Sequence, residues 1–155
     1  MDPLLRKLNL GDGSEIAALG APEGMGPILE RFAQDAAVTT ELAPGATFVI
    51  AFVRTAADIA RRAEEVAAAT EGDATVWMAY PKKSSPLHGP EVSRDASWGP
   101  TGAAGFEPVR QVAIDGDWSA VRFRRVEFIE RLTRDPSRAM TREGRRRATG
   151  GRRPA

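Results

Sequence analysis

Two lysines and two serines follow a nearly continuous apolar run and form the most promising chemical group in the sequence. The run covers residues 74–80, and the group after it is Lys82, Lys83, Ser84 and Ser85. A run without polar alternation is typical of a strand buried on both faces of a parallel sheet. The four side chains are therefore expected at the carboxyl edge of that sheet, where open α/β sheets bind ligands. Two ammonium groups and two hydroxyl donors suit a phosphate or carboxylate.

Further residues near this segment could extend the site. Arg94 would join it if a helix beginning near Asp95 lies above the same edge, and Trp98 could stack on a base or sugar ring. The alternatives are a solvated loop that keeps a hydrophobic strand soluble, with Ser85 as a helix cap, and a tryptophan that covers one end of the sheet. His88 lies too close to Ser85 in sequence to imply a proton relay, and we interpret it as a loop residue.

A glycine-rich turn is the second candidate site. Residues 15–20 form a short apolar strand candidate, and Gly20, Gly24 and Gly26 follow before the next helix. This spacing departs from the dinucleotide fingerprint Gly-x-Gly-x-x-Gly, and the carboxylate of Glu23 disfavours an anionic ligand there. The alternative is a turn that only lets the strand meet the helix.

Hydrophobic periodicity predicts two units of strand, helix and strand. The firmer unit joins strand 47–53 to strand 74–80 through a helix that begins with a capping box at Thr55 and Asp58. The earlier unit ends in strand 38–42. The link between the units is too short for a helical crossover. Either strand 38–42 runs antiparallel to its successor, or an extended strap carries the chain back.

A β-hairpin is predicted after a weaker helix at about 95–104. Its strands, 106–114 and 118–126, are joined by a turn that contains Asp115 and Asp117, which we interpret as turn residues. Apolar residues alternate with arginines in the second strand. This alternation indicates a half-exposed strand near an edge of the sheet.

Composition is that of an ordinary soluble globular protein. The 155 residues suit one domain, and the chain has no cysteine and a single histidine, which excludes thiolate chemistry and a histidine cluster. No stretch approaches the length of a membrane span and the N-terminus lacks a signal-peptide core. We therefore expect a cytoplasmic protein without a membrane partner.

The charge divides the chain at about residue 130. Residues 131–155 hold nine arginines against two acidic residues, a balance of +7, which leaves −6 for residues 1–130 because the total is +1. We expect an α/β domain over residues 1–130 and a basic, disordered tail after it. Arginines such as those of 145–147 and 152–153 suggest salt-dependent binding to nucleic acid, although no aromatic residue is interleaved with them.

Three segments carry a resemblance to known proteins. Residues 77–85 (WMAYPKKSS), 94–98 (RDASW) and 112–124 (VAIDGDWSAVRFR) are similar to a bacterial domain family that has no assigned activity. The whole arrangement resembles a shortened methyltransferase-type Rossmann fold, a three-layer α/β sandwich with a mostly parallel sheet and a C-terminal antiparallel hairpin.

The resemblance also implies a cofactor site to test. Methyltransferases of this fold bind S-adenosylmethionine through a glycine turn after the first strand and an acidic residue that ends the second, which implies Gly20, Gly24 and Glu41 here. Such enzymes usually carry a further strand and helix pair between strands 38–42 and 47–53, and this chain has no room for one.

The favoured interpretation is a non-catalytic Rossmann-like module that binds a small anionic ligand or a partner protein at residues 82–85. The alternatives are an S-adenosylmethionine-dependent methyltransferase and a nucleic-acid accessory protein that acts through its tail. The sequence identifies no cofactor, no catalytic residue and no oligomeric state.

Overall fold

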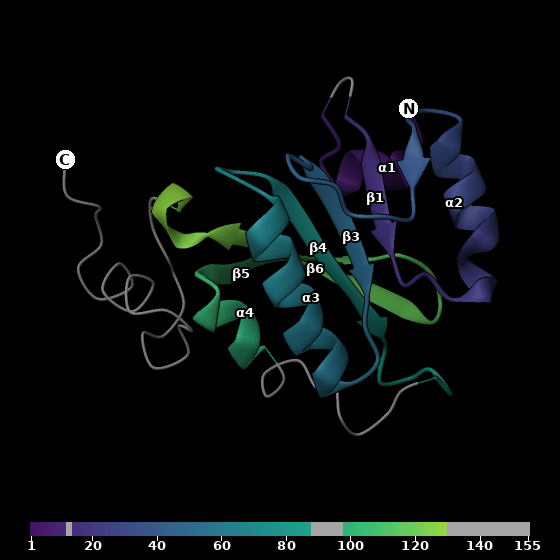
Figure 1. Ribbon diagram of the computed structural model, residues 1–155. Coiled ribbons are helices and arrows are strands. Elements are labelled where there is room, and N and C mark those ends of the chain that lie inside the picture. The colour runs from purple at the N-terminus through teal and green to yellow at the C-terminus, as the bar shows by residue number, and fades with distance from the viewer. Residues whose placement is uncertain (12–13, 88–97, 130–155) are drawn as a thin grey trace.

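The computed structural model describes residues 1–11, 14–87 and 98–129 (Figure 1). The expectations for His88, Arg94 and the tail after residue 130 lie outside this part of the chain. The elements follow one another as α1 (Pro3–Lys7), β1 (Ile16–Leu19), η1 (Glu23–Met25), α2 (Gly26–Ala33), β2 (Val38–Thr39), β3 (Phe48–Phe52), α3 (Ala56–Ala69), β4 (Thr75–Pro81), α4 (Gly99–Ala103), β5 (Phe106–Ala113), β6 (Trp118–Arg125) and η2 (Val126–Phe128).

The strands form one six-stranded sheet in the order β2-β1-β3-β4-β6-β5. The pairs among β2, β1, β3 and β4 are parallel, and β6 pairs antiparallel with both β4 and β5. Apolar residues of α1 and α2 pack on one face of the sheet and those of α3 on the other. The predicted three-layer α/β sandwich with a C-terminal antiparallel pair is therefore confirmed. None of the described helices is long and apolar enough to cross a membrane.

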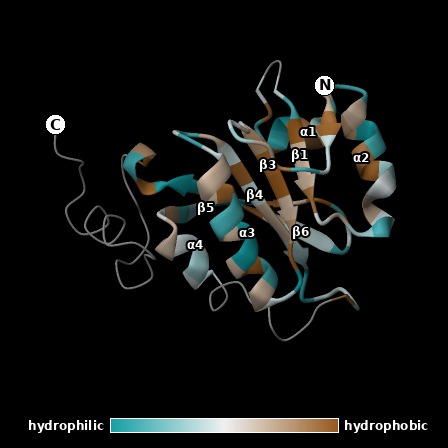
Figure 2. Ribbon diagram, viewed as in Figure 1, coloured by the Kyte–Doolittle hydropathy of each residue, from teal (hydrophilic) through white to brown (hydrophobic). Residues whose placement is uncertain are grey.

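The two central strands have no polar face. Phe48, Ile50 and Phe52 of β3 and Val76 and Met78 of β4 are each at most 5% exposed and lie in adjacent parallel strands, as predicted. Alternate side chains enter opposite cores, because successive residues of a strand point to opposite faces. Figure 2 shows hydrophobic residues along β1 and β3, and hydrophilic residues on the outer side of α3.

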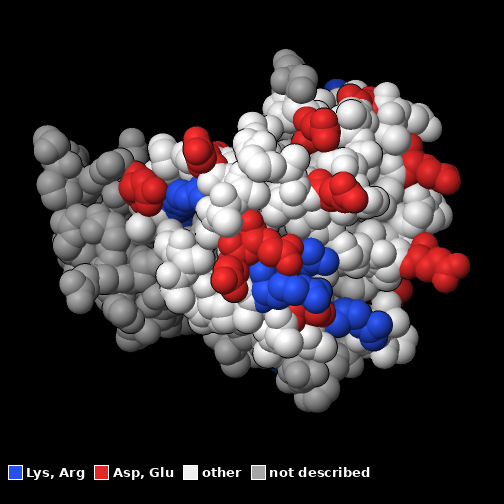
Figure 3. Space-filling view, viewed as in Figure 1, with Lys and Arg blue, Asp and Glu red and all other residues white. Residues whose placement is uncertain are grey.

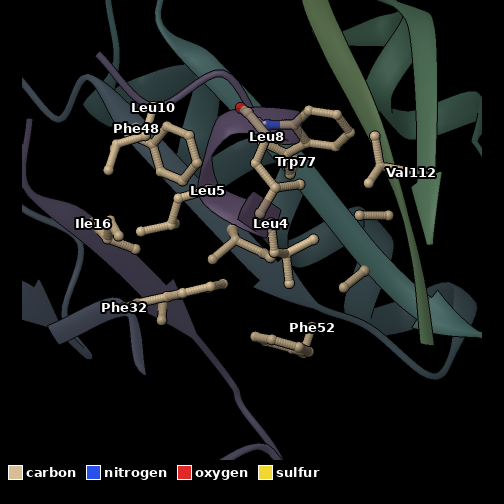
Figure 4. Close-up of a cluster of buried hydrophobic side chains, with 14 of the residues drawn as sticks. Leu4, Leu5, Leu8, Leu10, Ile16, Phe32, Phe48, Phe52, Trp77 and Val112 are labelled. Atoms are coloured by element: carbon tan, nitrogen blue, oxygen red, sulfur yellow. Dashed lines mark hydrogen bonds between the residues drawn. The ribbon is translucent and has the colours of Figure 1, made fainter. Parts of the chain in front are cut away.

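The core on the α1 side joins large side chains from helices and strands (Figure 4). Leu5, Phe32, Phe48 and Trp77 come from four different elements and are almost fully buried. The indole N–H of Trp77 donates to the backbone carbonyl of Leu8 at 2.8 Å. A buried indole needs such an acceptor, and this bond fixes the end of α1 against β4.

An extended strap joins the two halves of the parallel sheet. β2 runs parallel to β1 and does not pair with β3, which excludes the antiparallel alternative. Residues 40–47 then return across the α3 face, where Leu42 and Ala46 pack against the core. The N–H of Gly45 donates to the carbonyl of Ala69 at 2.8 Å, which anchors the strap at the end of α3.

The arginine-bearing strand lies one position inside the sheet edge. β6 lies between β4 and β5, and β5 is the edge strand. Arg124 forms a two-bond ion pair with Asp73, and Arg125 donates to the carbonyls of Thr70 and Gly72 while its guanidinium lies 4.9 Å from the ring centroid of Phe106. These arginines therefore bind the end of α3 and the turn after it.

Candidate functional site

The strand order points to the carboxyl ends of β1 and β3 as the place where a ligand crevice is expected. β1 leads into α2 on one face of the sheet, whereas its neighbour β3 leads into α3 on the other. Where connections leave adjacent strands toward opposite faces, open α/β sheets have a crevice outside the carboxyl ends of those strands. Gly20 follows β1 at this point, and Arg54 follows β3 after a single intervening residue. The crevice lies one strand away from the Lys82–Ser85 segment.

Gly20 is explained by contacts within the chain. Its φ of 68° lies in the left-handed region, and a Cβ atom there would meet Nη2 of Arg62 at 3.0 Å and the carbonyl oxygen of Phe52 at 3.3 Å. Both the conformation and the space therefore require glycine. Gly24 and Gly26 differ, because a Cβ atom on either would meet nothing within 4 Å. The turn has open space on its far side.

Arg62 reaches from α3 to the end of β1. Its side chain is only 17% exposed, and Nη1 donates to Oε2 of Glu65 at 2.9 Å. Its Nε–H is buried and finds no acceptor within the described part of the chain. Nε and Nη2 form one edge of a guanidinium, and such an edge takes both oxygens of a carboxylate or phosphate. Nη2 lies beside Gly20, so this edge of the guanidinium is suited to an oxyanion bound at the end of β1.

Other charged groups surround Arg62 on α3. Arg61 is 60% exposed and contacts Asp58 at 3.5 Å and Glu65 at 3.8 Å. Figure 3 shows basic and acidic side chains next to one another in the central region of this face, where α3 lies. Because Arg61 is solvated and weakly paired, its charge is largely screened. The buried guanidinium of Arg62 has the stronger local field.

Arg54 connects the crevice to the loop after β4. Its Nη2 donates to the carbonyl of Leu87 at 3.4 Å. Lys82 is half-buried, and Lys83 and Ser84 are exposed. The structure thus brings Arg54 close to the end of the predicted segment, and the cations of β3 and β4 share one edge of the sheet.

Ser85 has a defined partner in the fold. Its side chain is buried, and its hydroxyl donates to Oδ1 of Asp117 at 2.9 Å and accepts the N–H of Leu87 at 3.0 Å. Asp115 accepts the N–H groups of Asp117 and Trp118 at 2.8 Å, as expected for a turn residue. These bonds tie the end of β4 to the hairpin turn, so Ser85 positions the segment that carries the two lysines.

Trp98, the tryptophan that could have stacked on a ligand, lies in a core, and so does Trp118. Trp98 is 2% exposed, and its ring packs against Tyr80 and Phe123 at centroid distances of 5.6 and 5.2 Å. Trp118 is 3% exposed and meets Phe52 edge to face at 5.5 Å. Both rings are used in packing, and neither offers a free face to a ligand.

Glu41 lines a pocket that is separate from the carboxyl ends of β1 and β3. It lines a pocket of about 170 Å³ between the strap and the start of β1 and β3. Glu15 precedes β1 and Thr47 precedes β3, so this pocket lies toward the strand starts, at the other end of β1 from Gly20. The structure therefore does not bring Gly20 and Glu41 together. The pocket is also smaller than the roughly 300–1,000 Å³ of ordinary small-molecule sites.

Comparison with solved structures identifies the architecture. A SAM-dependent methyltransferase from Aquifex aeolicus has a similar fold with a TM-score of 0.52 and 14% identity, over 79% of this chain and 87% of that one. Fibrillarin, a pre-rRNA processing protein of Methanococcus jannaschii, aligns with a TM-score of 0.49 and 12% identity, over 73% of this chain and 66% of that one. The fold is that of the methyltransferases.

The sequence comparisons add no family. No protein-family model matches the chain, and neither does any curated protein. The resemblance of residues 77–85, 94–98 and 112–124 to a bacterial domain family therefore stays a prediction.

S-adenosylmethionine fits the described residues only in part. The open space beside Gly24 and the Nε–H of Arg62, which has no acceptor among the described residues, suit a turn-bound ligand with a carboxylate. The acidic residue expected at the end of β2 is Glu41, which instead lines the pocket under the strap. The strap stands where such enzymes usually have a further strand and helix pair. The groups that this pair would add to a cofactor site are therefore missing from the described residues. We derive no transfer step from them.

Sequence reasoning missed Arg54 and Arg62, although Arg62 carries a recognisable signal. Ile59, Ala63 and Val66 form the buried stripe of α3. Arg62 lies at the i+3 position from Ile59, on the same side of the helix. A charged residue within an apolar stripe is uncommon unless it has a partner. Glu65 pairs with Nη1 of Arg62, and the Nε–H that has no acceptor among the described residues is what points to a site.

Proposed function

We propose that this protein binds a small ligand in the crevice between β1 and β3 through a carboxylate or phosphate group of the ligand. Arg62 provides the principal donor edge, and Arg54, Lys82 and Lys83 add positive charge at the same edge of the sheet. The observation that carries the proposal is the guanidinium of Arg62, whose Nη2 lies beside Gly20 and whose buried Nε–H has no acceptor among the described residues.

The energetics favour an acceptor at this point. A buried donor left without a hydrogen bond costs about 1–3 kcal/mol, and charge-assisted bonds are roughly twice as strong as neutral ones. Glu65 satisfies only Nη1. A ligand oxyanion on the Nε and Nη2 edge would accept the remaining hydrogen bonds of the guanidinium and remove this cost.

Two variants of neighbouring arginines test the proposal. Parent, Arg62→Gln and Arg61→Gln proteins are melted with and without inorganic phosphate, acetate and S-adenosylmethionine at constant ionic strength. A ligand at 100 times its dissociation constant raises the free energy of unfolding by roughly 2.7 kcal/mol. We expect the parent and Arg61→Gln to be stabilised by at least one of these compounds, and Arg62→Gln to lose that response.

The same experiment has a clear opposite result. If Arg62→Gln responds to every ligand as Arg61→Gln does, then Arg62 holds no anion and the proposal fails. A further double variant, Lys82→Gln with Lys83→Gln, measures the share of the lysines. A smaller but still saturable response in that variant supports a site shared across the sheet edge.

Methyl transfer from S-adenosylmethionine is the second candidate, and the likeness of the fold to a methyltransferase favours it. In this case Arg62 would hold the carboxylate of the cofactor, and the chain would bind and orient it. Because the strap leaves the site incomplete, we expect no saturating isotherm in calorimetry at micromolar cofactor. A saturating isotherm that Gly24→Val abolishes would instead show cofactor binding at the turn, which this candidate requires.

A further inference from the structure

A second pair of arginines faces one another on the hairpin. The register of β5 and β6 pairs Arg110 directly with Arg122, and Arg122 also lies opposite Trp77 of β4. Val112 lies two residues after Arg110, and its partner Ala120 lies two residues before Arg122. Both belong to the core on the α1 side. Because side chains alternate along a strand, both arginines point to that same side of the sheet.

This pairing is electrostatically unfavourable without an anion. Side chains directly opposite in an antiparallel pair have Cβ atoms about 4.5–5.5 Å apart, and like charges there are destabilising. Burial lowers the pKa of Arg122, and the charges of Arg124 and Arg110 lower it further, against an opposing effect of Asp73. Asp73 is already bound by Arg124 through bonds of 2.9 and 2.6 Å.

Arg122 also has a free donor. Its Nε–H is buried and has no acceptor among the described residues, as found for Arg62. Arg110 is exposed, so the pair is open to solvent from the side of β5. Two guanidinium groups that face one another can bind different oxygens of one phosphate, which is how arginines hold phosphate groups in proteins.

We propose that Arg110 and Arg122 form a phosphate-binding clamp on the α1-side face of the hairpin, separate from the crevice between β1 and β3. The clamp takes the phosphate group of a small phosphorylated ligand or of a nucleic-acid backbone. Its position on β5 and β6 places it at the opposite side of β4 from Gly20. The clamp can therefore bind whether or not the crevice does.

The test uses Arg110→Gln, because Arg110 is exposed and its loss should not impair folding. Parent, Arg110→Gln and the control Arg61→Gln are melted in low-salt buffer with chloride or with inorganic phosphate at equal ionic strength. We expect Arg110→Gln to melt at or above the temperature of the parent in chloride, because a like-charge contact is removed. We expect it to show a smaller phosphate-induced shift than Arg61→Gln.

Two further arms separate the clamp from the crevice and identify the source of the phosphate. Each variant is also prepared in the Arg62→Gln background, where any phosphate response must come from outside the crevice. Fluorescence anisotropy with a short single-stranded oligonucleotide distinguishes the sources: loss in Arg110→Gln indicates a nucleic-acid backbone, and unchanged binding with a lost phosphate response indicates a small ligand. An Arg110→Gln protein with the full phosphate response overturns the proposal, even if the crevice binds an anion.

Discussion

The two strand-helix-strand units of this molecule differ in completeness. The unit β3-α3-β4 has five registered residue pairs between its strands, and its 14-residue helix begins with both halves of a capping box. The unit β1-α2-β2 has two registered pairs, and its eight-residue helix has no side-chain cap. The crevice lies between the two units. One wall is therefore held firmly, and the other depends on short elements and a strap.

This difference explains why Arg62, the arginine proposed to bind the ligand, belongs to the unit β3-α3-β4. Arg62 belongs to the complete unit and reaches across to Gly20 of the shorter one. A long side chain on a well-anchored helix is held in place before a ligand arrives, which lowers the entropic cost of binding. The short unit supplies a glycine turn and open space rather than charged groups.

The largest contrast is expected from one aspartate placed in each unit. Val76→Asp in β4 should prevent folding, because it buries an unpaired carboxylate. Val38→Asp in β2 should give a folded but less stable protein, because Val38 is only half-buried. Cooperative melting followed by circular dichroism checks both variants. A folded Val76→Asp protein, or an unfolded Val38→Asp protein, would break the distinction between the units.

An intermediate effect is expected within the glycine turn. Gly20→Ala should lower the free energy of unfolding by about 1–3 kcal/mol, because a Cβ atom is strained at this φ and meets Arg62 and the carbonyl of Phe52. Gly24→Ala should change it by less than about 0.5 kcal/mol, because nothing lies near the added atom. Urea denaturation of the two variants measures the difference, and equal losses would show that the contact with Arg62 is not a constraint.

The smallest contrast concerns two threonines. Thr55→Ala removes the hydroxyl that accepts the N–H of Asp58 at 3.0 Å and should cost about 1 kcal/mol. Thr39→Ala removes a weaker bond from the N–H of Glu41 at 3.2 Å on an exposed turn and should cost no more than about 0.5 kcal/mol. Urea midpoints at constant slope provide the comparison. A larger loss for Thr39→Ala would mean that the short unit is held more tightly than its bonds indicate.

The sequence predicts the fold well because its signals are local. The apolar runs of β3 and β4 and the capping box at Thr55 act within a few residues, and the structure confirms them. The path from β2 to β3 could not be decided, since a short link fits two strand directions until β1 takes its place between them.

The site was harder to predict because it depends on contacts across the chain. The positions of Arg62 over Gly20 and of Ser85 on Asp117 join residues more than 30 positions apart. No local pattern specifies such pairs. The sequence placed residues 82–85 at the carboxyl edge of the sheet, whereas the position between β1 and β3 follows from the strand order, which only the folded chain shows.

The central claim is that the Nε–H of Arg62 receives an oxyanion in the crevice. Nitrogen-15 NMR observes arginine Nε–H groups directly, and the spectrum of Arg62→Lys assigns this one. During titration with inorganic phosphate, we expect the Nε–H of Arg62 and the backbone N–H of Gly20 to shift together with one saturable midpoint. Signals of Arg62 and Gly20 that stay unchanged while other arginines saturate would contradict the account.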